Sequence, residues 1–289
     1  MSPAAFLRSR LTEGQLLKVM AAHSPLSAKL VEESGFDGVW ASGFELAALY
    51  GVADVSLVTM TQHLDMVRAM ADHTRLPIIA DIDTGFGNAV NVDYAIRQYE
   101  RAGAAAVVIE DKMFPKVTSL IEGGRQDLIS STEFEGKIGA ALAARRSPEF
   151  VVVARTEALI AGLGHEEALR RARAYADAGA DLILIHSKAK SPDEILAFIS
   201  AWDRPNPIVL VPTSYPDLTN ARIEALRKVG IVIYGNHAIR ASVRAMQAVF
   251  AQVVKDGGIH TLGDSVVPVD EVFRLQDMAH IRQLEQQFI

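Results

Sequence analysis

One pattern of apolar and polar residues recurs along the chain. An amphipathic segment is followed by a glycine, then by a short run that is apolar throughout and ends in polar side chains. A run that is apolar on both faces is typical of a parallel strand covered by helices, and the glycine suits the left-handed residue that ends a helix. The clearest copies have their glycines at Gly35, Gly103, Gly179 and Gly230. The pattern predicts repeated helix-to-strand units.

Eight short apolar runs qualify as strands. They are residues 18–22, 38–40, 77–81, 107–109, 150–154, 182–185, 207–211 and 232–234. Strands that alternate with helical segments favour a (β/α)8 barrel of the TIM type, in the α/β class, and an open, doubly wound sheet is the alternative. Residues able to do chemistry follow nearly every run. The barrel is favoured because it places all these strand ends on one rim.

The chain continues well beyond the eighth run. A helical stretch from about residue 237 to 255 leads through a glycine-rich turn to a second one from about residue 269 to 287. Eight units do not need this tail, so we expect it to pack on a neighbouring subunit. No linker interrupts the sequence, and we therefore expect residues 1–289 to form a single barrel domain that includes the C-terminal helices from about 237.

Composition narrows the class of protein. The 289 residues are 49% hydrophobic and 22% charged, which fits one large globular enzyme domain. The net charge of −6, without a basic cluster, argues against nucleic-acid or membrane partners. The absence of cysteine excludes disulfides, thiolate zinc sites and thiol nucleophiles. With no secretory signal and no run of 18 apolar residues, we expect a cytoplasmic protein.

Acidic residues follow two of the predicted strands. Asp81 and Asp83 close one run and Glu110 closes another. Residues i and i+2 of a strand share a face, so Asp81 and Asp83 are expected to converge on one cation. Oxygen ligands favour Mg²⁺, with Mn²⁺ or Co²⁺ as alternatives, and Mg²⁺ keeps part of its water shell. We therefore expect Asp81 to bind the metal directly and the other two to act through water. The alternative is a helix cap and a turn.

Other strand ends carry groups suited to an anionic substrate. Arg155 can grip a carboxylate or a similar anionic group, or form a buried salt bridge with Glu157. His186 can donate a proton or orient water, or be a structural residue. Backbone N–H groups at Ser42 and Gly43 can receive substrate oxygens, although Gly43 also suits a simple turn.

Five ordered motifs together resemble the phosphoenolpyruvate mutase and isocitrate lyase superfamily. They are residues 40–43 (WASG), 81–88 (DIDTGFGN), 110–116 (EDKMFPK), 153–158 (VARTEA) and 185–188 (IHSK). The resemblance covers nearly the whole chain. It implies an Mg²⁺-dependent enzyme with a small-molecule substrate, and a helix-swapped barrel that assembles as a homotetramer, a dimer of dimers.

The resemblance also assigns roles in two loops. It places Asp54 over the reacting bond, where its carboxylate accepts a phosphoryl group or positions water. Lys116, Thr118, Ser119 and Leu120 lie in a segment with few apolar anchors, which suits a lid that closes over the substrate. The loop continues with 123–125 (GGR), without the Asp that often precedes Gly-Arg in related loops.

The reaction follows from two comparisons within the superfamily. Lyases that split C–C bonds generally use a cysteine in this loop, and this chain has none, so the resemblance implies a C–P substrate, phosphonopyruvate. The mutase branch typically carries Asn where this chain has Thr118, which favours hydrolysis to pyruvate and phosphate. Isomerisation between phosphoenolpyruvate and phosphonopyruvate is the alternative, followed by a C–C lyase or a non-catalytic barrel.

Overall fold

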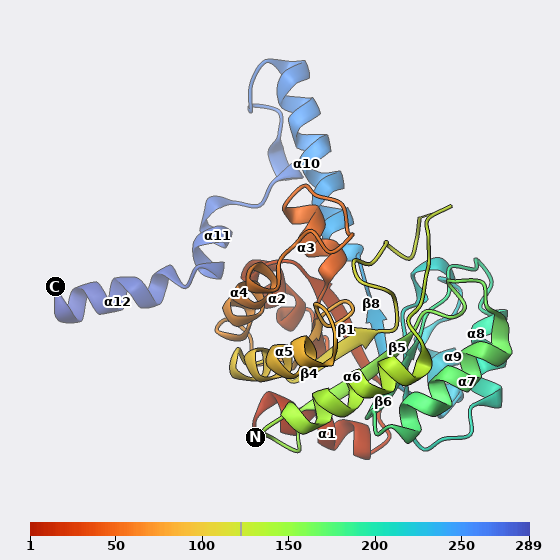
Figure 1. The fold of residues 1–289 in the computed structure, drawn as a ribbon. Coiled ribbons are helices and arrows are strands. Elements are labelled where there is room, and N and C mark those ends of the chain that lie inside the picture. The colour runs from red at the N-terminus through yellow and green to blue at the C-terminus, as the bar shows by residue number, and fades with distance from the viewer. Residues whose placement is uncertain (122) are drawn as a thin grey trace. The chain divides into compact units, whose positions relative to one another are not determined.

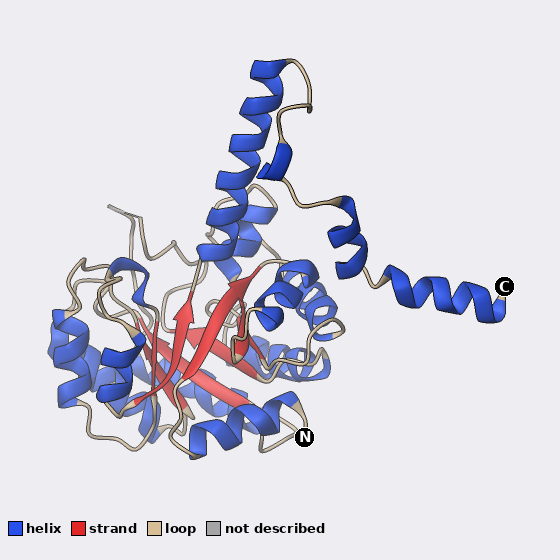
Figure 2. Ribbon diagram, turned by 180° about the vertical axis from the view of Figure 1, so that it is seen from behind, coloured by secondary structure: helices blue, strands red, loops and turns tan. Residues whose placement is uncertain are grey.

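The computed structural model describes residues 1–121 and 123–289. The chain divides into two compact units, residues 1–237 and 238–289, and each is treated by itself. In the described part of the first unit, eight parallel strands close into a barrel in the order β1 to β8. The helices of this unit surround the strands (Figures 1 and 2). The predicted (β/α)8 barrel is confirmed.

All eight predicted strands are present within the described residues. They are β1 (Leu17–Ala22), β2 (Gly38–Ala41), β3 (Ile78–Asp81), β4 (Ala106–Glu110), β5 (Val151–Thr156), β6 (Leu182–Ile185), β7 (Ile208–Leu210) and β8 (Val229–Tyr234). The helices of this unit are α1 (Pro3–Thr12), α2 (Pro25–Glu33), α3 (Gly43–Leu49), α4 (Met60–Ala71), α5 (Ala89–Arg101), α6 (Ser131–Ala144), α7 (Gly164–Asp177), α8 (Asp193–Ala201) and α9 (Asn220–Ala225), with a short 3₁₀ turn, η1 (Pro212–Ser214).

The strands separate two apolar cores. In β4, Ala106 and Val108 belong to the core inside the barrel, whereas Val107 and Ile109 belong to the core between strands and helices. Successive side chains of a strand point to opposite faces, so Glu110 continues the inward set at the end of the strand. The same alternation places four more side chains on the inner face, two of them one residue beyond the end of their strand. They are Ser42, Asp81, Arg155 and His186.

Three of the four unit-marking glycines take the predicted conformation. Gly35, Gly103 and Gly179 have φ of +80°, +91° and +101° directly after helices. The prediction for Gly230 is wrong, because it lies inside β8 and the left-handed residue after α9 is Arg227, with φ +56°. A Cβ on Gly230 would lie 2.9 Å from side-chain atoms of Leu11 and Pro207, so close packing requires glycine there.

The second unit is helical, as expected. It contains most of α10 (His237–Asp256), then η2 (Gly263–Ser265), α11 (Val269–Leu275) and α12 (Met278–Phe288). Along α10, exposed apolar side chains recur at helical spacing, at Val243, Met246, Phe250 and Val254. None of the helices in the described ranges combines the length and apolar character needed to cross a membrane. The single-domain organisation and the exchange of helices between subunits stay predictions.

We predict that Gly230→Ala lowers the free energy of unfolding by about 1–3 kcal/mol, the usual cost of overpacking, because Pro207 is too rigid to yield to the new methyl group. The matched control is Gly136→Ala in α6, where an added Cβ meets nothing within 4 Å. Replacing this helical glycine should stabilise the protein by about 0.5–1 kcal/mol. Urea titration measures both changes, and equal midpoints for the two variants would contradict the packing argument.

Candidate active site

A cavity of about 70 Å³ opens at the carboxyl ends of the strands. Every residue predicted for catalysis or substrate binding lies on its wall, except Gly43. The wall also includes six residues outside the predicted catalytic and substrate-binding sets: Trp40, Phe44, Val211, Thr213, Gly235 and Asn236. The predicted residues there are Ser42, Asp54, Asp81, Lys116, Thr118, Ser119, Leu120, Arg155 and His186.

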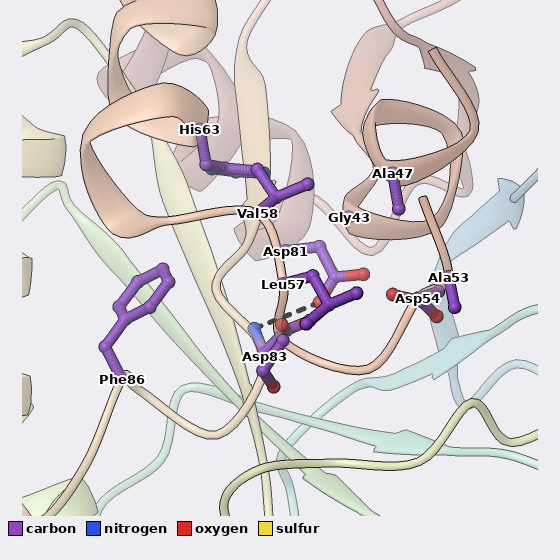
Figure 3. Close-up of a pocket in the computed structure, with 11 residues that line it drawn as sticks. Gly43, Ala47, Ala53, Asp54, Leu57, Val58, His63, Asp81, Asp83 and Phe86 are labelled. Carbon is purple, nitrogen blue, oxygen red and sulfur yellow. Dashed lines mark hydrogen bonds between the residues drawn. The ribbon is translucent and has the colours of Figure 1, made fainter. Parts of the chain in front are cut away.

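A second, much smaller cavity adjoins three carboxylates. Its volume is about 10 Å³, at the lower limit of what can hold one water molecule. Asp54, Asp81 and Asp83 line it together with Gly43 (Figure 3). A Cβ on Gly43 would lie 3.1 Å from Asp83 Oδ1 and 3.5 Å from Asp81 Oδ2. Glycine therefore leaves this space open, and a larger residue would intrude on the carboxylates.

Asp81 and Asp83 line the same cavity, but not for the reason expected from strand alternation. β3 ends at Asp81, and Asp83 lies beyond it in a left-handed conformation with φ +51°. The backbone N–H of Asp83 donates to Asp81 Oδ1 at 3.3 Å (Figure 3). The predicted strand geometry is wrong for Asp83, because a turn rather than a sixth extended residue returns its carboxylate to the cavity.

Lys116 connects two acidic segments. Its Nζ lies 2.9 Å from Asp54 Oδ1 and 2.7 Å from Asp83 Oδ1, and the side chain is buried. Burial works against the charged form, but Asp83 and Asp54 together hold the pKa of Lys116 well above its usual value. The backbone N–H of Lys116 also donates to Ser56 Oγ. These contacts join the loop between β4 and α6 to the loop after α3.

Within the described ranges, Glu110 is a buried carboxylate with a partner for only one of its two oxygens. Its Oε2 lies 3.3 Å from Arg155 Nε, while Oε1 is buried without a hydrogen-bond partner among the described residues. Burial raises the pKa of Glu110 to about 7, and burial is also the main cause that raises the pKa of Asp83 to about 6. Both groups would gain from a nearby cation.

The acidic groups fit a magnesium ion in one specific way. In the described ranges, no three His, Asp or Glu side chains converge closely enough to hold a metal among themselves. Mg²⁺ does not require such a cage, since proteins usually bind it through one or two carboxylates, with water and substrate oxygens completing the octahedron. The unpartnered oxygen of Glu110 and the water-sized cavity beside Asp81 and Asp83 suit that mode.

Glu157 joins the remaining predicted groups, although the sequence suggested it only as a partner for Arg155. Its Oε1 lies 2.5 Å from Arg155 Nε and 3.1 Å from His186 Nδ1. Its Oε2 accepts from Ser119 Oγ at 2.5 Å and lies 3.3 Å from Lys112 Nζ. The signal for Glu157 was its parity with Arg155 along β5, which places both side chains inward.

His186 is held as a neutral imidazole. Burial, and then the charge of Arg155, lower its pKa, more than Glu157 raises it. Arg155 Nη2 lies 2.8 Å from His186 Nδ1. Because a guanidinium can only donate, a neutral His186 that accepts this bond carries its proton on Nε2.

Two serine hydroxyls already have structural partners. Ser42 Oγ accepts from the N–H of Glu45, which caps α3, and donates to the carbonyl of Gly235 at 3.3 Å. Ser119 Oγ donates to Glu157 and accepts from both Lys112 and Arg155. Any contact of Ser119 Oγ with substrate would therefore displace one of these three.

Comparisons with known proteins agree with this geometry. The family model for phosphoenolpyruvate phosphomutase matches residues 7–254. The chain is 57% identical over 283 residues to phosphonopyruvate hydrolase of Variovorax sp. (strain Pal2), with 98% of each covered, and 42% identical to phosphoenolpyruvate phosphomutase of Tetrahymena pyriformis, with 98% and 94% covered. A crystal structure of phosphonopyruvate hydrolase with oxalate and Mg²⁺ is similar at a TM-score of 0.95 and 55% identity, covering 100% of this chain and 99% of that one. The chain belongs to the phosphoenolpyruvate phosphomutase family.

Proposed function

We propose that the chain hydrolyses the C–P bond of phosphonopyruvate to pyruvate and phosphate, with Mg²⁺ as cofactor. The observation that carries this function is the 57% identity to phosphonopyruvate hydrolase over 98% of both chains. The cavity supports it, because cationic and acidic groups meet there in a space suited to a small anion. The substrate and the metal of this chain are inferred from its relatives.

Three carboxylates would hold the metal. We assign Asp81 as a direct ligand, and Asp83 and Glu110 as acceptors for metal-bound water. When bound, Mg²⁺ disperses the negative charge that develops on the enolate oxygen as the C–P bond breaks.

The cationic side of the cavity would bind and orient the phosphonyl group. Arg155 Nε and Nη2 are engaged by Glu157, His186 and Ser119, while Nη1 has no hydrogen-bond partner among the described residues. We assign Nη1 and the Nε2–H of His186 as donors to phosphonyl oxygens. Backbone N–H groups at Ser42 and Gly43 would receive the carboxylate. Donors fixed in this way stabilise the transferring group without rearranging during the reaction.

The transfer itself requires an acceptor above the phosphorus. The new P–O bond forms to water, or first to Asp54 and then to water. The electron pair of the C–P bond goes to carbon, and protonation of the enolate completes pyruvate. Asp54 and Thr118 both line the cavity, which supports their assignment to this step. Lys116, at 2.9 Å from Asp54, would keep that carboxylate oriented.

Phosphoenolpyruvate mutase activity is the second candidate. It is favoured by the 42% identity to the Tetrahymena enzyme and by a TM-score of 0.96 to a phosphomutase structure from Streptomyces platensis subsp. rosaceus, 46% identical, which covers 99% of each chain. In that reaction the phosphoryl group returns to the enolate oxygen. Phosphorus NMR of the protein with phosphonopyruvate and Mg²⁺ distinguishes the two, because hydrolysis gives free phosphate and isomerisation gives phosphoenolpyruvate.

The assembly and location belong to the same proposal. We infer a homotetramer, a dimer of dimers that exchanges C-terminal helices, and the exposed apolar side chains of α10 support burial against another subunit. Light scattering after size exclusion tests the assembly. A cytoplasmic location, without nucleic-acid or membrane partners, agrees with the composition, which has no cysteine and a net charge of −6.

We predict that Asp81→Ala abolishes phosphate release more completely than Asp83→Ala, because it removes the direct metal ligand. The wild type should lose activity with chelator and regain it with Mg²⁺. Phosphate assays at saturating substrate provide the comparison. Full turnover by exhaustively demetallated wild-type protein would refute the metal assignment, whatever the variants did.

Thr118→Asn should slow phosphate release by about tenfold or more, the scale of one lost oriented hydrogen bond, and should expose some mutase activity. An Asn amide offers donors that hold the phosphoryl group for return to the enolate oxygen. Time courses of phosphate, pyruvate and phosphoenolpyruvate, at equal metal and substrate, measure the change. Phosphate release at the wild-type rate would show that Thr118 does not select hydrolysis.

We also expect divalent metal binding to tighten as pH rises through about 6 to 7 and to level off above that range. Loss of solvent raises the pKa values of the Asp83 and Glu110 carboxyls to about 6 and about 7, so both are protonated at lower pH, and metal binding must expel those protons. Electron paramagnetic resonance of Mn²⁺ measures the affinity without turnover. Glu110→Gln should flatten the upper part of the profile, and a pH-independent wild type would contradict the prediction.

A further inference from the structure

The two ends of the loop between β4 and α6 are hydrogen-bonded to each other. Lys112 pairs with Leu128 in an antiparallel bridge, and the N–H of Met113 donates to the carbonyl of Asp127 at 2.9 Å. Between these residues the chain leaves the barrel, and its segment 116–120 lines the cavity. Its apolar residues, Val117 and Leu120, belong to neither apolar core, so its polar contacts are the ones that can hold it there.

Lys112 supplies the central contacts. Its side chain is 1% exposed, and Nζ lies 2.7 Å from the carbonyl of Val117, 2.7 Å from Ser119 Oγ and 3.3 Å from Glu157 Oε2. The first two contacts are hydrogen bonds donated by the ammonium group, and the third is an ion pair. Two of the acceptors belong to segment 116–120, and the third belongs to the barrel.

Ser119 completes the connection. Its hydroxyl donates to Glu157 and accepts from Lys112 and Arg155, so all of its capacity is used when the segment lies on the barrel. If the segment moved away, Lys112 would lose two partners and Glu157 would lose one. Buried charged groups without partners are costly, which favours the placed segment.

We propose that Lys112 is a positioning residue that holds segment 116–120 over the cavity through Val117 and Ser119, and thereby sets how often the site is closed. This inference rests on the proposed function for its kinetic consequence. The contacts themselves concern only the segment and the barrel. If closure is needed for tight binding, the apparent dissociation constant rises in proportion as the closed fraction falls.

Limited proteolysis with trypsin tests the proposal without turnover. The Lys116 side chain is 6% exposed and bound to Asp54 and Asp83, so cleavage after Lys116 requires release of the segment. Arg125, in the same loop, has a side chain that is 74% exposed, and cleavage after it serves as an internal reference. Mass spectrometry of the fragments gives the ratio of the two rates.

Lys112→Met should raise this ratio by about tenfold or more, because it removes both charge-assisted contacts to the segment. The KM for phosphonopyruvate should rise only as far as the closed fraction falls, and Lys112→Arg should restore part of both changes. The matched control is Lys228→Met, which removes contacts to the carbonyls of Ile199, Ser200 and Trp202 near the opposite end of the barrel. It should change neither the ratio nor KM.

An unchanged ratio in Lys112→Met, or an equal rise in Lys228→Met, would overturn the proposal. If Lys112→Met does not fold, Ser119→Ala carries the test, because it removes one of the two Lys112 contacts to the segment, together with the Ser119 bonds to Glu157 and Arg155, and leaves Lys112 with two partners. That variant should raise the ratio by about threefold or more, and no change would again overturn the proposal. Wild-type protein that releases no phosphate from phosphonopyruvate would refute the proposed function alone, since the cleavage ratio would still be measurable.

Discussion

The rest of the site depends on the contacts made by the carboxylate of Glu157. It is fully buried, and it would destabilise the fold if it stood alone. Burial works to raise its pKa, but the charges of Arg155 and then Lys112 oppose that effect, and the pKa lies well below its usual value. Its backbone N–H donates to buried Asp111 at 2.9 Å, which fixes the end of β5. The Glu157 carboxylate therefore positions Arg155, His186 and, through Ser119, the loop between β4 and α6.

Three acids of the rim, Glu157, Glu110 and Asp83, fall into two electrostatic classes. Glu157 is surrounded by cations and stays ionised, whereas Glu110 and Asp83 have raised pKa values because their partners do not offset burial. The first kind of carboxylate organises the protein itself. The second kind is stabilised when a cation arrives, which is the behaviour expected of metal ligands and explains why neighbouring acids need not share a role.

The sequence predicts this barrel because apolar runs and their polar ends repeat at regular intervals. Strand parity also aims Asp81, Glu110 and Arg155 inward, so much of the cavity wall could be predicted from the residues. The left-handed turn at Asp83 and the packing role of Gly230 could not, since both depend on neighbours distant in the chain. Lys112 escaped notice because a buried lysine and a solvated one look alike in sequence.

The bridge between Lys112 and Leu128 also makes the loop structurally independent of the barrel strands. Because the loop leaves and returns at paired residues, its length and composition can change without shifting any strand. Asp81, Glu110 and Arg155 lie on strands, and Asp83 lies directly beyond one, so all four are outside this loop. Under the proposed function, changes confined to this loop could therefore alter where the phosphoryl group goes while the barrel stays the same.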